Sequence, residues 1–211
     1  MEEASELLHK AQRHLARRDS VLRQVIKAVG PCTLRYSADR FGALARSIVA
    51  QQISTKAAAA ILGRLEQAAG SRGITAARIL KIPEPVLRQA GLSANKCKSF
   101  YDLARKVHDG GVRLKDLHDL SDEEVIAHLV PVRGIGRWTA EMFLIFSLGR
   151  LDVLPVDDFG LRAGVRRQYD FKELPTRKQL EALAEPWRPY RSIGTWYIWR
   201  SLGAVRQSEV K

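Results

Sequence analysis

Apolar residues recur at helical spacing along nearly the whole chain, with polar caps, glycines and prolines between the runs. Residues 2–29 predict one or two helices that end at Gly30-Pro31. Residues 37–65 predict a longer helical stretch in which Ser54 caps a second helix. Alternation of apolar and polar residues never lasts more than a few positions, so strands are not expected. The pattern therefore predicts an all-α protein.

Shorter helices are predicted in the rest of the chain, because residues that break helices are frequent there. The breaks expected between residues 71 and 111 are Pro83, Pro85, Gly91 and Gly110-Gly111. The residues expected to cap later helices are Ser93, Ser121 and Thr176. The last predicted helix is the aromatic-rich run SIGTWYIWRSLGAV. No linker and no repeat of fixed period divides the chain.

The charge balance favours a polyanionic partner. Lys and Arg outnumber Asp and Glu by 35 to 23, which gives a net charge of +12 and a pI near 10.1. Charge alone does not establish a nucleic-acid partner, because many basic proteins carry solvated Lys and Arg faces. The scattered histidines suggest no zinc site. Cys32 and Cys97 stand in no CxxC pair, so neither a disulfide framework nor a four-cysteine iron–sulfur cluster is expected.

The sequence gives no sign of a membrane partner. No apolar run approaches the roughly 20 residues that a membrane helix needs, and the Glu-rich N-terminus does not resemble a signal peptide. We expect the protein in the cytoplasm, with the nucleoid, if its source is bacterial or archaeal. In a eukaryote we expect it in the nucleus.

The segment PVRGIGRWTAEM combines a glycine-containing hairpin with the start of an apolar helix. Gly134 and Gly136 allow positive φ and let the backbone approach another molecule, and a helix from Arg137 begins with unpaired N–H groups. Such a backbone nest beside a helix N-terminus binds an anion, for example a DNA phosphate. A tight turn between two helices with glycine caps is the alternative reading of these residues.

Two adjacent carboxylates, Asp157 and Asp158, follow Pro155. Neighbouring side chains point in different directions, so these acids are not expected to work as a glycosidase-type pair. We expect one of them to be catalytic and the other to cap a helix that begins near Phe159. The alternative is that both acids only cap that helix.

The run RGIGRWTAEMF followed by DVLPVDDFGLR resembles the helix-hairpin-helix DNA glycosylases with a Gly/Pro-rich loop and an invariant aspartate, the HhH-GPD superfamily. The segment ARSIVAQQIS and the aromatic C-terminal helix also resemble its 3-methyladenine DNA glycosylase II (AlkA-like) branch. The resemblance implies one glycosylase unit over residues 1–211, with two helical lobes and a DNA-binding cleft between them. Lobe A spans about 40–150 with the hairpin at 130–137, and lobe B comprises 1–39 and 151–211. No N-terminal β domain is expected.

Cleavage of an N-glycosidic bond passes through an oxocarbenium-like sugar, which a fixed carboxylate beside C1′ stabilises. The resemblance assigns this role to Asp158, which follows Trp138 by twenty residues as the family's aspartate does. An alignment gap that matches Pro155 would instead select Asp157. Family members that also cut the strand carry a Schiff-base lysine just after the hairpin. Trp138 stands there, which implies a monofunctional enzyme that uses water and leaves an abasic site.

A base inside a duplex must be flipped into a pocket before it can be excised. The aromatic residues proposed for this pocket are Trp138, Trp199, Phe159, Trp196 and Tyr197, the first two by family position. For Trp196 and Tyr197 the alternative is core packing of the last helix. Gln51 and Gln52 stand where the resemblance places the residues that enter the duplex as a wedge. The alternative for these glutamines is a solvated surface pair.

Further contacts are expected at the hairpin. The expected phosphate contacts are Arg133, Gly134, Gly136, Arg137 and Thr139, with Lys96 and Lys98 more remotely. By resemblance, a structural Na⁺ or K⁺ would bind the backbone carbonyls of Val130, Val132 and Ile135. No cofactor is expected for catalysis. Arg200 and Met142 stand where a better-known family member has tyrosines, so the substrate range stays open.

These residues lead to the hypothesis of a monofunctional DNA glycosylase of base excision repair, of DNA-3-methyladenine glycosylase II type and without lyase activity. Its substrate would be double-stranded DNA with alkylated purines such as 3-methyladenine and 7-methylguanine. The alternatives are a non-catalytic helix-hairpin-helix module that binds damaged DNA, or a glycosylase for deaminated or oxidised bases. The protein is expected to act as a monomer.

Overall fold

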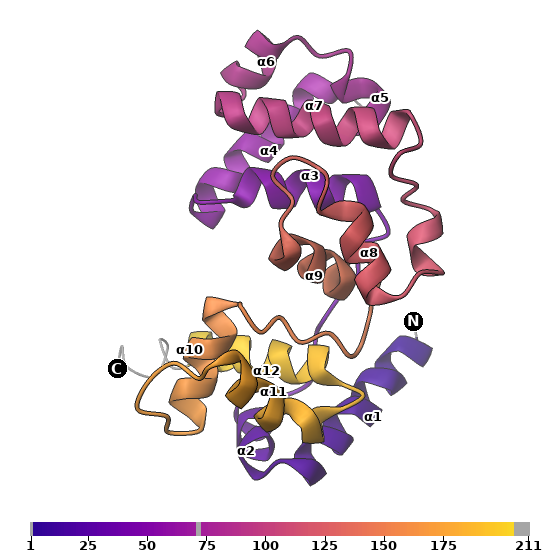
Figure 1. Cartoon of the computed structure of the whole chain (residues 1–211). Helices are drawn as coiled ribbons and strands as arrows, with labels where there is room; N and C mark the ends of the chain where they lie inside the picture. Colours follow the sequence, from indigo (N-terminus) through magenta and orange to yellow (C-terminus); the bar gives the residue numbers. More distant parts are fainter. Residues whose placement is uncertain (1, 71–72, 205–211) are drawn as a thin grey trace. The chain divides into compact units, whose positions relative to one another are not determined.

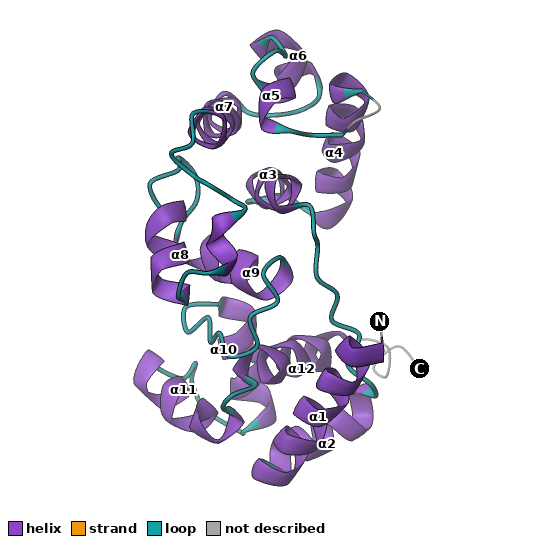
Figure 2. Ribbon diagram, turned by 90° about the vertical axis from the view of Figure 1, so that its right-hand side faces the viewer, coloured by secondary structure: helices purple, strands orange, loops and turns teal. Residues whose placement is uncertain are grey.

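The computed structural model describes residues 2–70 and 73–204, apart from the side chains of residues 2–5, 55 and 204. Helices joined by loops and turns make up these ranges, and no strand occurs in them (Figure 1, Figure 2). The prediction of an all-α protein is confirmed. No helix in the described part of the chain is long and apolar enough to cross a bilayer.

The chain forms two compact units. The discontinuous unit comprises Met1–Tyr36 and Gly149–Lys211, and the continuous unit comprises Ser37–Leu148. The helices of the discontinuous unit are α1 (Glu2–Arg18), α2 (Ser20–Val29), α10 (Phe159–Gln168), α11 (Arg177–Ala184), the 3₁₀ helix η2 (Glu185–Trp187) and α12 (Arg191–Ala204). The aromatic-rich α12 packs against α2 and α10, and α1 packs against α2. Ile193, Tyr197 and Ile198 of α12 are fully buried in the core of this unit.

Asp19 ends α1 and connects three parts of the discontinuous unit. Its Oδ1 accepts hydrogen bonds from the N–H groups of Val21 and Leu22, both at 2.9 Å, and so caps α2. Its Oδ2 accepts the Tyr169 hydroxyl at 2.6 Å and the Trp187 indole N–H at 2.8 Å. Burial and this contact raise the pKa of Tyr169 well above its usual value. One carboxylate therefore satisfies a helix end and two buried ring donors.

Two glycines allow close packing around α12. A Cβ on Gly164 of α10 would lie 2.3 Å from Cγ2 of Ile198, and a Cβ on Gly194 would lie 2.6 Å from the ring of Trp187. Contacts this short do not occur between real atoms, so any side chain at either position would push α12 away from its neighbour. Small residues at these positions therefore set the spacing of the helices that carry the candidate site.

The continuous unit is arranged around a central helix, α3 (Arg40–Ala50), which packs against α4, α7 and α9 (Figure 2). The helices that follow α3 are α4 (Thr55–Ala69), α5 (Ala76–Ile79), α6 (Glu84–Gln89), α7 (Ala94–His108), the 3₁₀ helix η1 (Asp116–His118), α8 (Asp122–Leu129) and α9 (Arg137–Phe146). Leu44 and Ile48 of α3 are fully buried, together with Leu65 and Leu103.

The predicted helix starts are confirmed where a serine or threonine caps them. The side chains of Ser54, Ser93, Ser121 and Thr176 each accept a backbone N–H at the start of their helix. The break predicted at Pro85 is wrong, because Pro85 lies in the first turn of α6. Proline is tolerated there, since the first N–H groups of a helix have no partner within it.

We predict that Asp19→Ala lowers the free energy of unfolding by about 2–4 kcal/mol, because it removes a cap and leaves two ring donors unpaired. Urea titration followed by circular dichroism measures this. Asp119→Ala, which changes an exposed aspartate, is the matched control. A loss below about 0.5 kcal/mol, the range of ordinary surface changes, would show that Asp19 is not the connection described.

Candidate active site and DNA interface

Asp158 lies at the N-terminus of α10 with only 9% of its surface exposed. Its Oδ1 accepts a hydrogen bond from the Leu161 N–H at 2.5 Å and another from the Trp199 indole Nε1 at 2.7 Å. Leu161 belongs to the first turn of α10 and Trp199 to α12, so two helices orient the carboxylate. A carboxylate fixed in this way can face a developing positive charge without reorganisation.

Local sequence explains why the acid and the indole meet. The Asp158 N–H donates to the Pro155 carbonyl at 2.9 Å, which closes a turn just before α10. A Cβ on Gly160 would lie 3.2 Å from Asp158 Oδ1 and 3.3 Å from Trp199 Cδ1. Glycine at 160 therefore leaves the room in which the indole reaches the carboxylate.

The loop before the acid is fastened to the start of α12. The Ser192 hydroxyl donates to the Arg150 carbonyl at 2.7 Å and accepts the Val153 N–H at 2.9 Å. The Arg191 guanidinium donates to Asp152 Oδ1 at 2.8 Å and to the Asp152 carbonyl at 2.7 Å. Sequence reasoning missed these residues, because no local pattern links positions that lie about forty residues apart.

Asp157 is exposed, and its two carboxylate oxygens bind the guanidinium of Arg177 in the first turn of α11, at 2.5 and 2.6 Å. The expectation that Asp157 would cap the helix at Phe159 is wrong, because Asp158 is both the cap and the buried acid. The N–H groups of the first helical turn face residue 158, whereas the side chain of residue 157 points to the surface.

Two of the aromatic residues predicted for a base pocket are buried. Tyr197 is fully buried, and its hydroxyl donates to the Gly30 carbonyl at 3.0 Å. The core-packing alternative is therefore correct for Tyr197, and the pocket role is wrong because no face of its ring is accessible. Trp196 is 7% exposed and meets Tyr197 edge-on, with ring centroids 4.9 Å apart.

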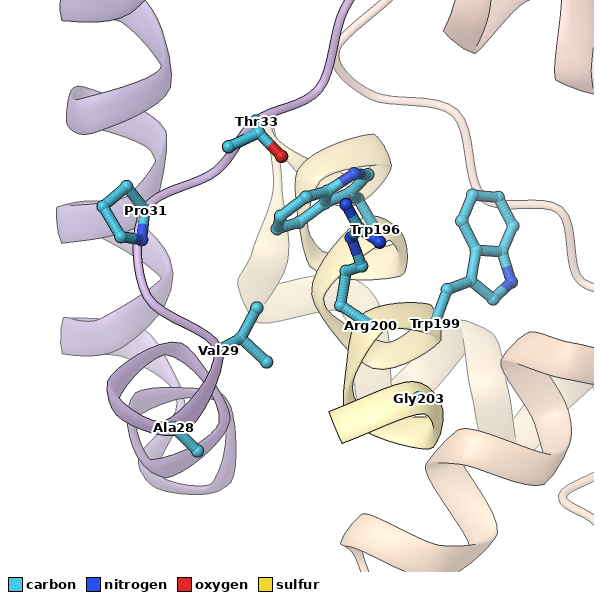
Figure 3. A pocket seen from close by; sticks show the side chains of 8 residues that line it. All are labelled: Ala28, Val29, Pro31, Thr33, Trp196, Trp199, Arg200 and Gly203. Carbon is cyan, nitrogen blue, oxygen red and sulfur yellow. The ribbon is translucent and has the colours of Figure 1, made fainter. Parts of the chain in front are cut away.

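A pocket of about 650 Å³ opens beside Trp196, between the end of α2 and α12 (Figure 3). Arg200 lies over the Trp196 ring with its Cζ 5.3 Å from the centroid, which is a cation–π contact. The Trp199 indole is turned away from both side chains, and its Nε1 contacts Asp158 instead. The indole beside the acid therefore does not stack with Trp196.

Phe159 and Trp138 are the exposed aromatic residues of the predicted set. Phe159 is 71% exposed as the first residue of α10, next to Asp158 in the chain. Trp138 is 44% exposed as the second residue of α9. A ring that stacks on a base needs an accessible face, which both residues have.

The helix-hairpin-helix arrangement consists of α8, residues 130–136 and α9, and the two helices pack against each other. Gly134 has a φ of +80°, as expected, and a Cβ there would lie 2.7 Å from Ser99 Oγ. Gly136 does not use the positive φ that glycine allows, since its φ is −92° at the N-cap of α9. No side chain caps α9, and a Cβ on Gly136 would meet nothing within 4 Å. The fold therefore requires glycine at 134 and not at 136.

Helix α7 fastens the hairpin through residues that sequence reasoning missed. Asp102 Oδ2 accepts the Arg133 N–H at 2.7 Å and the Lys106 amine at 2.6 Å, and that amine also donates to the Pro131 carbonyl at 3.0 Å. Partial burial acts to raise the pKa of Asp102. The hydrogen bonds from Lys106 and from the Arg133 N–H outweigh it and hold that pKa below its usual value. The spacing of Asp102 and Lys106 on one helix face was the available signal.

Two of the expected phosphate contacts have side chains that are paired or buried within the protein. Arg137 donates to both carboxylate oxygens of Glu123 in α8 and, at 3.2 Å, to Glu141, so its guanidinium joins α8 to α9. Thr139 is 4% exposed, so its side chain is interior and only its backbone remains as the expected contact. Arg133 is exposed, with Nη2 3.4 Å from Asn95 Oδ1.

The two glutamines of the predicted wedge differ. Gln51 Nε2 donates to the Gly134 carbonyl at 2.7 Å, so this amide is bound to the hairpin. Gln52 is exposed and has a φ of +58°. The Lys96 amine donates to the carbonyls of Val49 at 2.6 Å and of Gln51 at 2.8 Å.

The carbonyls expected to bind a cation lie in the hairpin. The Val132 carbonyl accepts the Ile135 N–H at 3.0 Å, and a carbonyl with one such bond has a second lone pair that a cation can use. Within residues 2–70 and 73–204 there is no group of three His, Cys, Asp or Glu side chains that could hold a metal. Cys32 and Cys97 are free thiols.

Two packed helices joined by a glycine hairpin define a protein of the helix-hairpin-helix class, which also holds a buried acid beside an indole. The model of the HhH-GPD superfamily of base excision DNA repair proteins matches residues 45–189. The chain belongs to this superfamily.

Relatives and solved structures agree with this assignment. The DNA-3-methyladenine glycosylase 1 of Schizosaccharomyces pombe is 34% identical over 205 residues, which cover 95% of this chain and 90% of that protein. The structure of 3-methyladenine DNA glycosylase (Mag1) from the same organism in complex with abasic DNA has a TM-score of 0.82 at 33% identity, covering 91% of this chain and 96% of that chain. A Bacillus halodurans DNA-3-methyladenine glycosidase has a TM-score of 0.81 at 37% identity, covering 92% and 89%.

We predict that the stability lost in Asp102→Asn depends on pH. Because the folded pKa of Asp102 lies below its unfolded value near about 3.9, its ion pair stabilises the protein above that pH, and the contribution disappears as pH falls through the folded pKa. Urea unfolding of wild type and variant should therefore differ most near neutral pH and converge in acid. Asp119→Asn should show no such trend, and a constant difference for Asp102→Asn would contradict the ionic contribution.

Proposed function

We propose that this protein is a monofunctional DNA glycosylase of base excision repair, which flips alkylated purines out of double-stranded DNA and releases them by hydrolysis. The observation that carries this proposal is the buried Asp158 carboxylate, fixed by the Leu161 N–H and the Trp199 indole, in a chain of the HhH-GPD superfamily. Double-stranded DNA with damaged bases is the proposed partner, and a monomer is the proposed active form.

Asp158 would act on the sugar. The bond between C1′ and the base nitrogen breaks, and the base leaves with the electron pair, so positive charge develops on the sugar. The carboxylate stabilises that charge and accepts a proton from the water whose oxygen bonds to C1′. A purine alkylated at N3 or N7 already carries positive charge and leaves readily, so one carboxylate and one water suffice.

Trp138 supports a water mechanism. It stands at the position where the resemblance places the Schiff-base lysine of members that also cut the strand, and an indole cannot form a Schiff base. The product would therefore be an abasic site in an uncut strand. The names of the S. pombe and B. halodurans relatives support alkylated purines as the substrate.

The exposed aromatic residues and Trp199 would receive the base. A cationic purine is attracted to indole faces by about 0.5–2 kcal/mol per ring. Trp199 contacts the acid, and Trp138 and Phe159 have accessible faces. We propose Trp199 and Phe159 as stacking residues of the discontinuous unit and Trp138 as a stacking residue of the continuous unit, whereas Trp196 packs beside Tyr197.

The hairpin would hold the phosphate backbone without reading sequence. The N-terminus of α9 is capped by a glycine and by no side chain, whereas Asp158 caps α10 and Ser121 caps α8. A phosphate at Gly136 would satisfy the N–H groups of the first turn of α9. Arg133 is the proposed charged contact, and a monovalent cation on the Val130, Val132 and Ile135 carbonyls remains part of the proposal.

We predict that Asp158→Asn lowers the single-turnover rate of 3-methyladenine or 7-methylguanine release from methylated duplex DNA by about 10²–10³-fold. Asparagine is as good an N-cap as aspartate, so this variant removes the charge and keeps the cap. Asp157→Asn is the matched control and should retain activity, because an exposed ion pair contributes little.

Full activity in Asp158→Asn would assign the chemistry to another residue. A wild-type protein that binds damaged DNA but releases no alkylated or deaminated base would favour the non-catalytic module.

We predict that Gly136→Ser weakens binding to undamaged duplex by about 1.5–3 kcal/mol, the value of a hydrogen bond to a charged group. Serine is a good N-cap and its Cβ has free space, so the melting temperature should not fall. Fluorescence anisotropy at fixed salt measures the affinity. Gly63→Ser in α4, also with open space at Cβ, should leave it unchanged, and equal affinities for all three proteins would remove Gly136 from the phosphate site.

A further inference from the structure

The segment after α3 has an unusual backbone. The helix ends at Ala50, Gln51 turns out of it with φ −57° and ψ 128°, and Gln52 follows with φ +58°. A residue with a side chain is strained in this left-handed region, so neighbouring contacts must maintain it. Gln52 is exposed, so the contacts that hold its backbone come from residues around it.

Lys96 supplies the first of these contacts. Its amine, on α7, donates to the carbonyls of Val49 and Gln51 at 2.6 and 2.8 Å. Carbonyls at the C-terminal end of a helix lack partners within the helix, and a cation there is favourable. Partial burial lowers the pKa of the Lys96 amine from its usual value.

Gln51 supplies the second contact and connects the segment to the hairpin. Its amide donates to the Gly134 carbonyl at 2.7 Å. The hairpin is itself bound to α7 through Asp102 and Lys106. A hydrogen-bond network within the continuous unit therefore joins helix α7, the segment 51–52 and the hairpin.

We propose that Lys96 and Gln51 are positioning residues. They fix the position of Gln52 relative to the phosphate-binding hairpin, so that binding of the DNA backbone by the hairpin places Gln52 for insertion into the duplex. This inference rests on the proposed function. It assigns insertion to Gln52 alone and removes Gln51 from the wedge, because the Gln51 amide is already bound to Gly134.

The physical basis of the proposal is the precise position that a wedge must have in the base stack. A wedge stabilises a flipped base only when it fills the gap left in the stack, because flipping loses the stacking and pairing of that base. A displacement of about 1 Å at such a site can cost up to about 10²-fold in rate. Loss of this hydrogen-bond network should therefore reduce insertion of Gln52 while the hairpin still binds phosphate.

The test measures two dissociation constants for each variant, one with undamaged duplex and one with duplex that contains a tetrahydrofuran abasic analogue, together with the melting temperature and the single-turnover excision rate. The variants are Gln51→Leu, Gln52→Ala, Lys96→Met and Lys96→Arg. Gln67→Leu and Lys81→Met are the matched controls, since they remove the same groups from exposed positions elsewhere in the continuous unit.

We expect Gln51→Leu and Lys96→Met to bind undamaged duplex within about twofold of wild type and to lose preference for the abasic duplex and excision rate by about tenfold or more. Lys96→Arg should keep most of the preference for the abasic duplex and most of the excision rate, because a guanidinium also donates to two carbonyls. The double variant Gln51→Leu/Gln52→Ala should be no worse than Gln52→Ala, as residues that serve one function are not additive.

Additive losses in the double variant, or equal losses of affinity for both duplexes, would overturn the proposal. The hydrogen-bond network would then only support the hairpin. A wild type without preference for the abasic duplex would overturn it too. If Lys96→Met does not fold, Gln51→Leu decides. Because both dissociation constants are measured without cleavage, an inactive wild type that keeps the preference would defeat the proposed function and leave this inference standing.

Discussion

The bond between the Trp199 indole and Asp158 exists only because α10 and α12 lie very close together. Glycine at 160 leaves space for the indole, and glycine at 164 leaves space for Ile198. A side chain at 164 would separate the helices, and one at 160 would require the indole or the carboxylate to shift by a few tenths of an ångström. The carboxylate also caps α10, so its orientation follows from the direction of that helix. Close helix packing, rather than a flexible loop, therefore determines where the acid points.

The positive charges of this protein serve two purposes that a charge count does not separate. Arg137, Lys106 and Lys96 bind carboxylates or carbonyls of the protein itself, and these bonds fix the hairpin and the segment after α3. Arg133 in the hairpin is exposed. A net charge of +12 predicts a polyanionic partner, yet several of the cations nearest to the proposed interface are bound to groups of the protein itself.

Local features of the fold could be predicted from sequence, and long-range features could not. Helical periodicity and the capping residues Ser54 and Ser121 correctly predicted the helices they begin, because periodicity and caps depend on neighbours in the chain. The twenty-residue interval from Trp138 selected Asp158, which the structure buries beside an indole. The connections made by Asp19 span about 150 residues, so no local pattern reveals them. Burial of Tyr197 depended likewise on helix packing that sequence does not show.

Three pairs of similar residues in the candidate site each divide into two roles. Gly134 is required by its positive φ, whereas Gly136 meets no constraint from the fold. Gln51 is bound to the hairpin and Gln52 is exposed. A residue that must meet a ligand at a defined place needs a neighbour whose contacts fix the backbone, because each rotatable bond left free costs entropy on binding. The aspartates divide in the reverse sense: exposed Asp157 is paired with Arg177, and Asp158 is buried. The charge stabilisation proposed for Asp158 is stronger away from water, whereas the phosphate contact proposed for Gly136 and the wedge proposed for Gln52 need exposed residues.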